Sequence, residues 1–342
     1  MTLPALLVLC VSLGCVPKAS APRQPTPVER RAEARPTVIE STIRASAPTA
    51  IPTVRPTPVV ESHARPLAVI IENAPDARPQ AGLSQADLVV EAMTEGGISR
   101  FMAVFSSQEP AVVGPVRSAR HYFVALAAEL GAPLVHFGAS PRGYEEISTT
   151  KLPTVDGITG NGPFWRDPRR AAPHNAYTSV ADARASVSTQ WPSARIETMA
   201  VLGNQLTPWS APSVGRHISL AFRPWQYRAN FDFDEARQMY TRSTDGEIQR
   251  DAAGGVPLQA GTIAILTIPG PIVDASGRLD IALRGEGDLI LVSLGTAERG
   301  RWLKRSSAEP LHFVSATGQS LTPPRAPLWV EIVQPETQVD VN

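Results

Sequence analysis

The sequence predicts an α/β domain over residues 65–190, followed by a β-rich and mostly antiparallel domain over residues 195–335. Up to about residue 190, apolar runs of strand length alternate with helical patterns, which is typical of an α/β domain. After Trp191 the chain changes to short alternating runs separated by turn residues, which is typical of antiparallel sheets. The length of 342 residues suits two domains, since a domain usually holds roughly 100–200 residues.

The first half opens with three predicted strands. Residues 67–72 (LAVIIE) form a continuous apolar run of strand length. Residues 87–94 and 98–106 predict two further strands, and the short polar segment that contains Gly96 and Gly97 predicts a hairpin between them.

Helices and a long loop follow in the first half. Residues 117–130 predict a helix with one apolar face, and residues 132–140 predict another strand. Ser140 is a favourable residue for the start of a short helix. Residues 150–178 are polar and loop-like, and a loop of that length inside a compact domain is usually functional. A last helix is predicted from about residue 179.

The second half is predicted to be built from short strands joined by tight turns. Asp245-Gly246 and Ser276-Gly277 are the turn signals between them. The strand-like runs are HISLAF, YRANFDF, RQMYTR, TIAILTI, LDIAL, DLILVS and LWVEIV.

The first 15 residues have the features of an export leader. Their apolar run has about the length of a signal-peptide core and is too short to span a bilayer. Gly14-Cys15 follows the run directly, as at a bacterial lipoprotein processing site, so we expect a lipid on Cys15 to anchor the protein in the membrane. The alternative is a plain secretory signal, in which this cysteine has no role.

Residues 16–64 predict a disordered, Pro-rich tether, because they are rich in Pro, Ala, Thr and Arg without a sustained apolar period. With the leader, they predict an exported protein anchored on the extracytoplasmic face, in the cell envelope. Lys+Arg and Asp+Glu both number 32, which disfavours a nucleic-acid partner, since such proteins usually carry a basic excess. The only cysteines are Cys10 and Cys15, so thiolate zinc sites and cysteine nucleophiles are excluded from the mature domains.

Arginines at the predicted helix start point to an anion site. Arg117 and Arg120 fall on the first turn of that helix, where the helix dipole disfavours positive charge. A bound anion would offset both the dipole and the arginines. Ligands of open α/β sheets bind at the carboxyl ends of the strands, so we expect several guanidinium groups to converge there. The predicted cleft is lined by Arg78, Arg100, Arg117, Arg120 and Arg166, with His174 and Asn175 at its rim.

The competing interpretation is a structural network with no vacant site. Arg117 and Arg120 would then pair with Glu91, Glu95 or Asp167. We favour a cleft because burying five arginines in a purely structural network would carry a large desolvation penalty.

Four residues are candidates for catalysis, without a motif that decides between them. His174 lies in the long loop and suits acid–base chemistry, whereas His136 lies within an apolar strand, where a hydrogen-bonded core histidine is the commoner outcome. Glu91 and Asp167 could form the carboxylate pair that cleaves glycans, and their separation would decide the mechanism. No HExxH motif or close ligand pair occurs, and we expect neither a metal nor a cofactor.

Several motifs, in order and in spacing, resemble one known family. They include GPVRSARHYF, VHFGAS, VDG, FWRD and APHNAYT, together with the long stretch that begins RPLAVIIENAPDARPQ. On these motifs the chain resembles the YerB-like bacterial lipoproteins over about residues 65–335, more loosely in the second half. The resemblance implies an exported, often lipidated, two-domain protein of a family of unknown function, and it implies no reaction.

The function expected from these residues is binding of an anionic ligand by an envelope lipoprotein. The ligand would be a wall-glycan fragment or a phosphorylated polymer precursor, held in the arginine-lined cleft. Whether the protein is an enzyme stays open: a glycan-cleaving hydrolase or a phosphoryl-transferase acting on the same ligands is one alternative, and a non-catalytic scaffold is another. Two titratable groups within hydrogen-bond reach in the cleft would favour catalysis.

Overall fold

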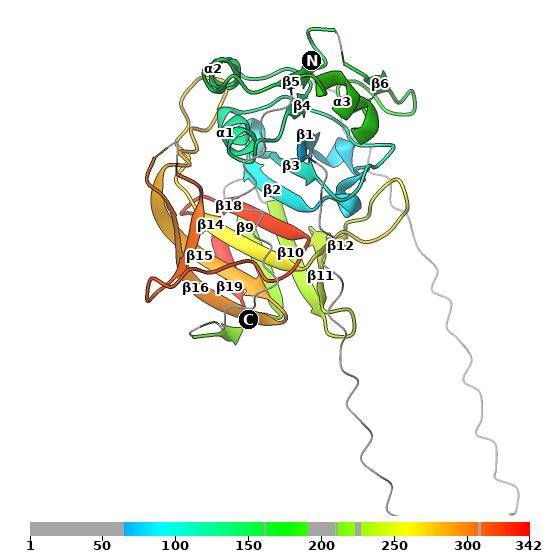
Figure 1. Ribbon diagram of the computed structural model, residues 1–342. Helices are drawn as coiled ribbons and strands as arrows, with labels where there is room; N and C mark the ends of the chain where they lie inside the picture. The colour runs from blue at the N-terminus through cyan, green and yellow to red at the C-terminus, as the bar shows by residue number, and fades with distance from the viewer. Residues whose placement is uncertain (1–64, 161, 191–208, 210, 223–226, 307–308) are drawn as a thin grey trace, which may run out of the picture. The chain divides into compact units, whose positions relative to one another are not determined.

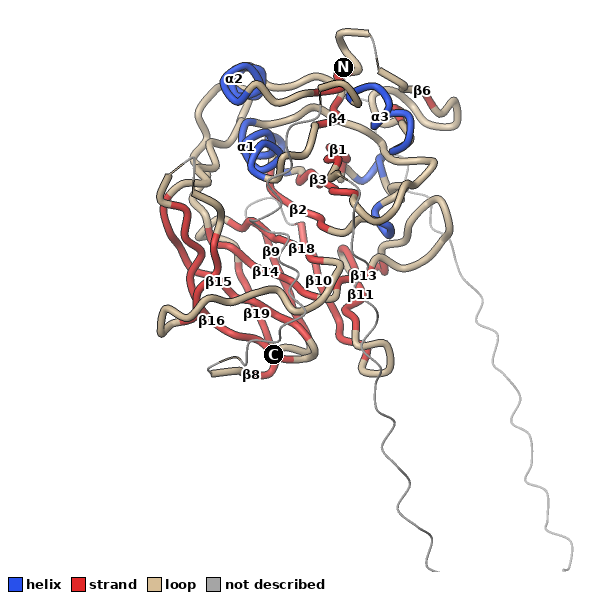
Figure 2. The backbone as a smooth tube through the Cα atoms, in the orientation of Figure 1, coloured by secondary structure: helices blue, strands red, loops and turns tan. Residues whose placement is uncertain are grey.

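The computed structural model describes residues 65–160, 162–190, 209, 211–222, 227–306 and 309–342. The predicted leader, the anchor at Cys15 and the tether over residues 16–64 lie outside the described residues. In the described part strands far outnumber helices (Figures 1 and 2).

The larger sheet contains eleven strands and has the order β17-β16-β15-β14-β18-β2-β3-β1-β4-β5, with β8 paired to β16. Its strands from the first half are β1 (Leu67–Glu72), β2 (Leu88–Met93), β3 (Ser99–Phe105), β4 (Leu134–His136) and β5 (Thr154–Asp156). Those from the second half are β8 (Ser213–Val214), β14 (Thr262–Thr267), β15 (Gly285–Ser293), β16 (Thr296–Lys304), β17 (His312–Ser315) and β18 (Leu328–Val333).

The same sheet runs through both halves of the chain. Strand β18 pairs in parallel with β2, in a register that runs from Leu328 opposite Leu88 to Ile332 opposite Ala92 (Figure 1, red beside cyan). The sequence predicted two domains that pack together, and it did not predict a shared sheet. The signal was present, since LWVEIV and LVVEAM are both apolar runs interrupted only by Glu331 and Glu91, as expected of parallel strands buried on two sides.

The second sheet comes entirely from the latter half, and all its pairs are antiparallel. Asp245 and Gly246 form the predicted turn between two of its strands. Its main path is β12-β11-β10-β9-β19, with β13 paired to β11. The strands are β9 (His217–Phe222), β10 (Tyr227–Asp234), β11 (Met239–Thr244), β12 (Glu247–Ile248), β13 (Gln259–Ala260) and β19 (Gln338–Val341).

The α-helices of the described part all belong to the first half. They are α1 (His121–Glu129), α2 (Pro141–Thr150), which Ser140 caps as predicted, and α3 (Val180–Val187). Three short 3-10 helices precede them: η1 (Pro75–Ala77), η2 (Leu83–Gln85) and η3 (Glu95–Gly97), the last lying in the predicted hairpin. The first half is therefore of mixed α/β character, and the second is β-rich with one parallel pair, β14–β18.

Helix α1 begins later than predicted. The sequence placed its start near Arg117, but the preceding segment is extended and bridges neighbouring strands. Val116 bridges Ile71, the Arg117 amide donates to the carbonyl of Ile70, and Ala119 bridges Ala139. Arg120 is the N-cap, with extended φ and ψ. The two arginines are thus not on the first turn of the helix.

A buried charge cluster joins the two halves. Arg242, on β11, is fully buried and forms an ion pair with Glu91 on β2. It also lies over the rings of Phe101, Phe231 and Trp329, at 5.3, 5.5 and 5.1 Å. Such a network stabilises only the arrangement in which both halves are present.

Candidate functional site

The carboxyl ends of three parallel strands form the edge where the candidate site lies. Strands β1, β4 and β5 run parallel and end at Glu72, His136 and Asp156. Open sheets usually bind ligands at this edge, as the sequence analysis assumed. We call this region, together with Arg117 and His174 that contact it, the carboxyl edge.

Glu72 holds two of the predicted site residues. Its side chain is only 3% exposed. Oε1 lies 2.9 Å from Nε of Arg117, and Oε2 lies 2.9 Å from Nδ1 of His174, which comes from the long loop 102 residues later. Two titratable groups, His174 and Glu72, therefore lie within hydrogen-bond reach beside an arginine.

Glu95 holds Arg100 and Arg120. Both guanidinium groups pair with its carboxylate, Arg100 at 3.3 Å, and both also donate to the carbonyl of Ser118. Burial raises the pKa of Glu95, but the hydrogen bond from Arg120 and the charge of Arg100 outweigh it and lower the pKa to about 2. Burial, aided by the charge of Arg120, lowers the pKa of Arg100 to about 10.

Arg100 links this group to the carboxyl edge. It stands opposite Glu72 in the β1–β3 register, and the charge of Arg117 contributes to its lowered pKa. The structure therefore places Arg100, Arg117 and Arg120 near one another, with Glu72 and Glu95 among them. These two carboxylates supply much of the negative charge that the sequence analysis assigned to a ligand.

The two remaining predicted arginines, Arg78 and Arg166, contact other residues than Glu72 and Glu95. Arg78 donates to Asn73, the residue after Glu72, and lies 3.7 Å from a carboxylate oxygen of Asp245. Arg166 donates to Oδ1 of Asn175 at 2.6 Å and lies over the ring of Phe137 at 5.0 Å.

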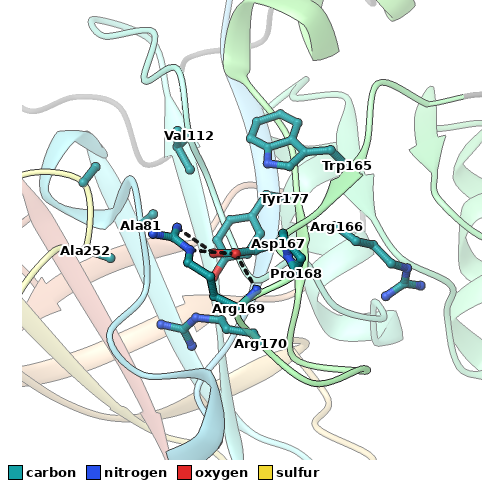
Figure 3. Close-up of a pocket in the computed structure, with 11 residues that line it drawn as sticks. Ala81, Val112, Trp165, Arg166, Asp167, Pro168, Arg169, Arg170, Tyr177 and Ala252 are labelled. Atoms are coloured by element: carbon teal, nitrogen blue, oxygen red, sulfur yellow. Dashed lines mark hydrogen bonds and ion pairs between the residues drawn. The ribbon is translucent and has the colours of Figure 1, made fainter.

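A pocket of about 700 Å³ lies beside the hairpin formed by β6 (Trp165–Arg166) and β7 (Ala176–Tyr177) (Figure 3). We call it the arginine pocket. Trp165 is 40% exposed and stacks on Tyr177, with ring centroids 6.4 Å apart. The residues that line the pocket are Ala81, Val112, Trp165, Arg166, Asp167, Pro168, Arg169, Arg170, Tyr177, Ala252 and Ala253.

Positive charge exceeds negative charge around this pocket. Asp167 is bound by Arg169, whose hydrogen bonds lower the pKa of Asp167 to about 2. Arg170 donates to the main-chain carbonyls of Asp76 and Pro79, which do not neutralise its charge. In Figure 3, Arg169 and Arg170 point to the same side, whereas Arg166 extends to the opposite one.

The other catalytic candidates have structural partners. Glu91 is fully buried and forms an ion pair with Arg242 in the cluster between the halves. His136 is fully buried, with Nδ1 2.8 Å from the carbonyl oxygen of Gly138, and burial lowers its pKa. Asp167 lines the arginine pocket, where its carboxylate accepts hydrogen bonds from Arg169.

Sequence reasoning missed Glu72, Trp165 and Arg170. Glu72 ends an otherwise apolar run at a strand terminus, which is the signal that could have identified it. Trp165 stands directly before Arg166 in the FWRD motif, and Arg170 follows in the same loop. Only the fold shows that these loop residues face Ala252, from the second half.

The described residues contain no group of three or more His, Cys, Asp or Glu side chains that could hold a metal ion. Within the same residues, no helix has both the length and the apolar character needed to cross a membrane.

Comparison with known proteins assigns the chain to a family. Residues 53–193 match the N-terminal domain of DUF3048, described as a protein of unknown function, and residues 218–330 match the C-terminal domain of the same family. The chain therefore belongs to this two-domain family, as the motifs indicated.

A relative from Bacillus subtilis (strain 168) carries the name "Putative lipoprotein YerB". It is 35% identical over 240 residues, which make up 70% of this chain and 72% of the relative. The crystal structure of YerB from the same organism is similar, with a TM-score of 0.70 and 31% identity, covering 82% of this chain and 94% of that chain. The resemblance to YerB-like proteins is thereby confirmed.

Proposed function

We propose that the protein is an exported envelope lipoprotein, anchored through Cys15, that binds an anionic envelope polymer in the arginine pocket. The name of its relative supports the anchor. The ligand is a wall-glycan fragment or a phosphorylated polymer precursor.

The observation that carries the proposal is the charge of Arg170 in a pocket that the exposed ring of Trp165 also lines. Carbonyl oxygens orient this guanidinium without cancelling its charge. A guanidinium is well suited to carboxylate and phosphate because its donors form a planar fork. Trp165, which is 40% exposed and stacks on the buried ring of Tyr177, adds an apolar surface on which a sugar ring or a glycerol unit can pack.

Calorimetric titration of the purified protein tests the proposal. The probes are a poly(glycerol phosphate) oligomer, a disaccharide-peptide wall fragment and inorganic phosphate. Arg170→Ala should weaken binding of a charged probe about ten- to a hundredfold, since a hydrogen bond to a charged group is worth about 1.5–3 kcal/mol. Trp165→Ala should weaken the two polymer probes but leave inorganic phosphate unchanged.

Arg299→Ala is the matched control, because Arg299 is exposed on β16 and does not line the pocket. Equal losses in Arg170→Ala and Arg299→Ala would show that only the overall charge matters. Absence of binding by the unmodified protein to all three probes would contradict the proposed function.

A further inference from the structure

Glu72 orients two groups whose outer atoms are free. Its buried carboxylate contacts Nε of Arg117 and Nδ1 of His174, each at 2.9 Å. A carboxylate can only accept, so Nδ1 of His174 donates and the neutral ring keeps its lone pair on Nε2. The same contact fixes the orientation of the ring.

The outward atoms reach solvent. The side chains of Arg117 and His174 are 27% and 21% exposed. Three outward atoms have no hydrogen-bond partner among the described residues: Nη1 and Nη2 of Arg117 and Nε2 of His174. None of these atoms is among the buried unpaired atoms of the described residues, so each is accessible to solvent. His136, by contrast, is fully enclosed, as a core histidine is expected to be.

We propose that Glu72, His174 and Arg117 form a catalytic centre that hydrolyses phosphodiester bonds in the bound polymer. This inference rests on the proposed function. A carboxylate–histidine pair supplies a base held in one tautomer, and the adjacent guanidinium fork binds the phosphoryl oxygens, whose charge it stabilises in the transition state.

The reaction consumes one water molecule. Nε2 of His174 takes a proton from water as the water oxygen attacks phosphorus. The bond from phosphorus to one esterified oxygen breaks, and the proton on His174 passes to that departing oxygen. The products are a phosphomonoester and an alcohol, with no change in oxidation state. Arg117 contacts the two non-bridging oxygens throughout.

The carboxylates nearby do not suit glycoside cleavage. That reaction uses a protonated carboxyl group paired with a second carboxylate, about 5–9.5 Å apart. The pKa values of Glu95 and Asp167 are both lowered to about 2, so neither holds a proton at neutral pH. Glu72 accepts contacts with both of its oxygens. The histidine is the group of this site that can exchange a proton.

The long loop connects the centre to the arginine pocket. Arg170 and His174 are four residues apart, and Asn175 accepts from Arg166 while donating to the carbonyl of Arg170. His174 of the proposed catalytic centre therefore belongs to the same loop as Arg170 of the arginine pocket.

The test measures hydrolysis by the full mature chain. Bis(4-nitrophenyl) phosphate reports turnover by absorbance, and poly(glycerol phosphate) reports phosphomonoester formation by phosphorus NMR. His174→Asn should lower kcat about a hundredfold or more on both probes, the range expected for loss of a general base. Arg117→Lys, which keeps the charge beside Glu72 but loses the guanidinium fork, should lower kcat/KM.

His312→Asn is the matched control, since His312 is exposed on β17, and it should keep the full rate. No turnover by the unmodified protein, or equal rates for it and His174→Asn, would overturn this inference. Calorimetric binding at the arginine pocket is measured on the same samples, so loss of turnover with intact binding leaves the proposed function standing. If His174→Asn does not fold, the kcat/KM of Arg117→Lys decides: an unchanged kcat/KM overturns the inference.

Discussion

Glu331 is a buried acid whose surroundings favour its neutral form. It lies opposite Glu91 in the β2–β18 register, and neither of its oxygens has a hydrogen-bond partner among the described residues. Burial, followed by repulsion from Glu91, raises its pKa well above the ordinary value of 4.5. Keeping it protonated costs about 1.4 kcal/mol for each pH unit above that unfolded-state value, until the folded pKa is reached.

Glu331→Gln should therefore stabilise the protein at neutral pH. A raised folded pKa gives stability that is complete below pH 4.5 and is lost as the pH rises. The melting temperature of the variant should match that of the unmodified protein near pH 4.5 and exceed it increasingly toward pH 8. Glu247→Gln, on an exposed strand, should show no such trend. A variant that melts lower at pH 8 would contradict this account.

Strand β7 of the β6–β7 hairpin packs closely against the backbone of Gly114. A Cβ atom at Gly114 would lie 2.8 Å from both the carbonyl oxygen of Ala176 and the ring of Tyr177, and its φ of +150° disfavours other residues. Strand β7 lies so close to residue 114 that only glycine fits at that position. Trp165 pairs directly with Tyr177, so displacement of β7 also moves the exposed ring of Trp165.

Gly114→Ala should lower both stability and binding of poly(glycerol phosphate). Gly246→Ala separates steric clash from backbone strain, because Gly246 has a φ of +90° with nothing within 4 Å of a Cβ atom. We expect Gly246→Ala to cost about 1 kcal/mol, and Gly114→Ala to cost more and to weaken binding. Thermal melts and calorimetry measure the two effects. Equal melting temperatures for the two variants would show that β7 tolerates the added carbon.

The shared sheet makes the first half dependent on the second. A fragment of residues 65–193 lacks β18, which leaves the edge of β2 unpaired, and lacks Arg242, which leaves Glu91 without its cation. An unpaired edge promotes aggregation, and an uncompensated buried charge costs about 3–5 kcal/mol. We expect this fragment to aggregate or to remain unfolded in sedimentation and circular dichroism measurements.

The same chain cut at an engineered protease site between residues 191 and 208, with both pieces retained, is the control. It should keep the native circular dichroism spectrum, because every pairing of β2 and Arg242 is still available. A monomeric, cooperatively melting fragment of residues 65–193 would instead show that the halves are independent.

Features of the fold and the site were predictable from the sequence where they depend on residues that are close together in the chain. Strands β1, β2 and β3 and the cap at Ser140 are set by neighbouring residues, and the sequence predicted them closely. The convergence of Arg100, Arg117 and Arg120 followed from the usual position of ligand sites. The start of α1 was predicted wrongly, because Val116 and Ala119 bridge strands that lie elsewhere in the chain. The Glu72–His174 contact spans 102 residues, and no local pattern reveals it.

The continuous sheet also bears on how this family can vary. The two halves match separate domain models, N-terminal and C-terminal, of the one family, which suggests modules that could be exchanged between relatives. Five residue pairs of β2 and β18, the Arg242–Glu91 ion pair and the pocket contact of Ala252 all cross that boundary. A chimera that joins the first half of one relative to the second half of another would mismatch all of them at once. We therefore expect such chimeras to fold poorly unless the residues on one side of the boundary are changed to match those on the other.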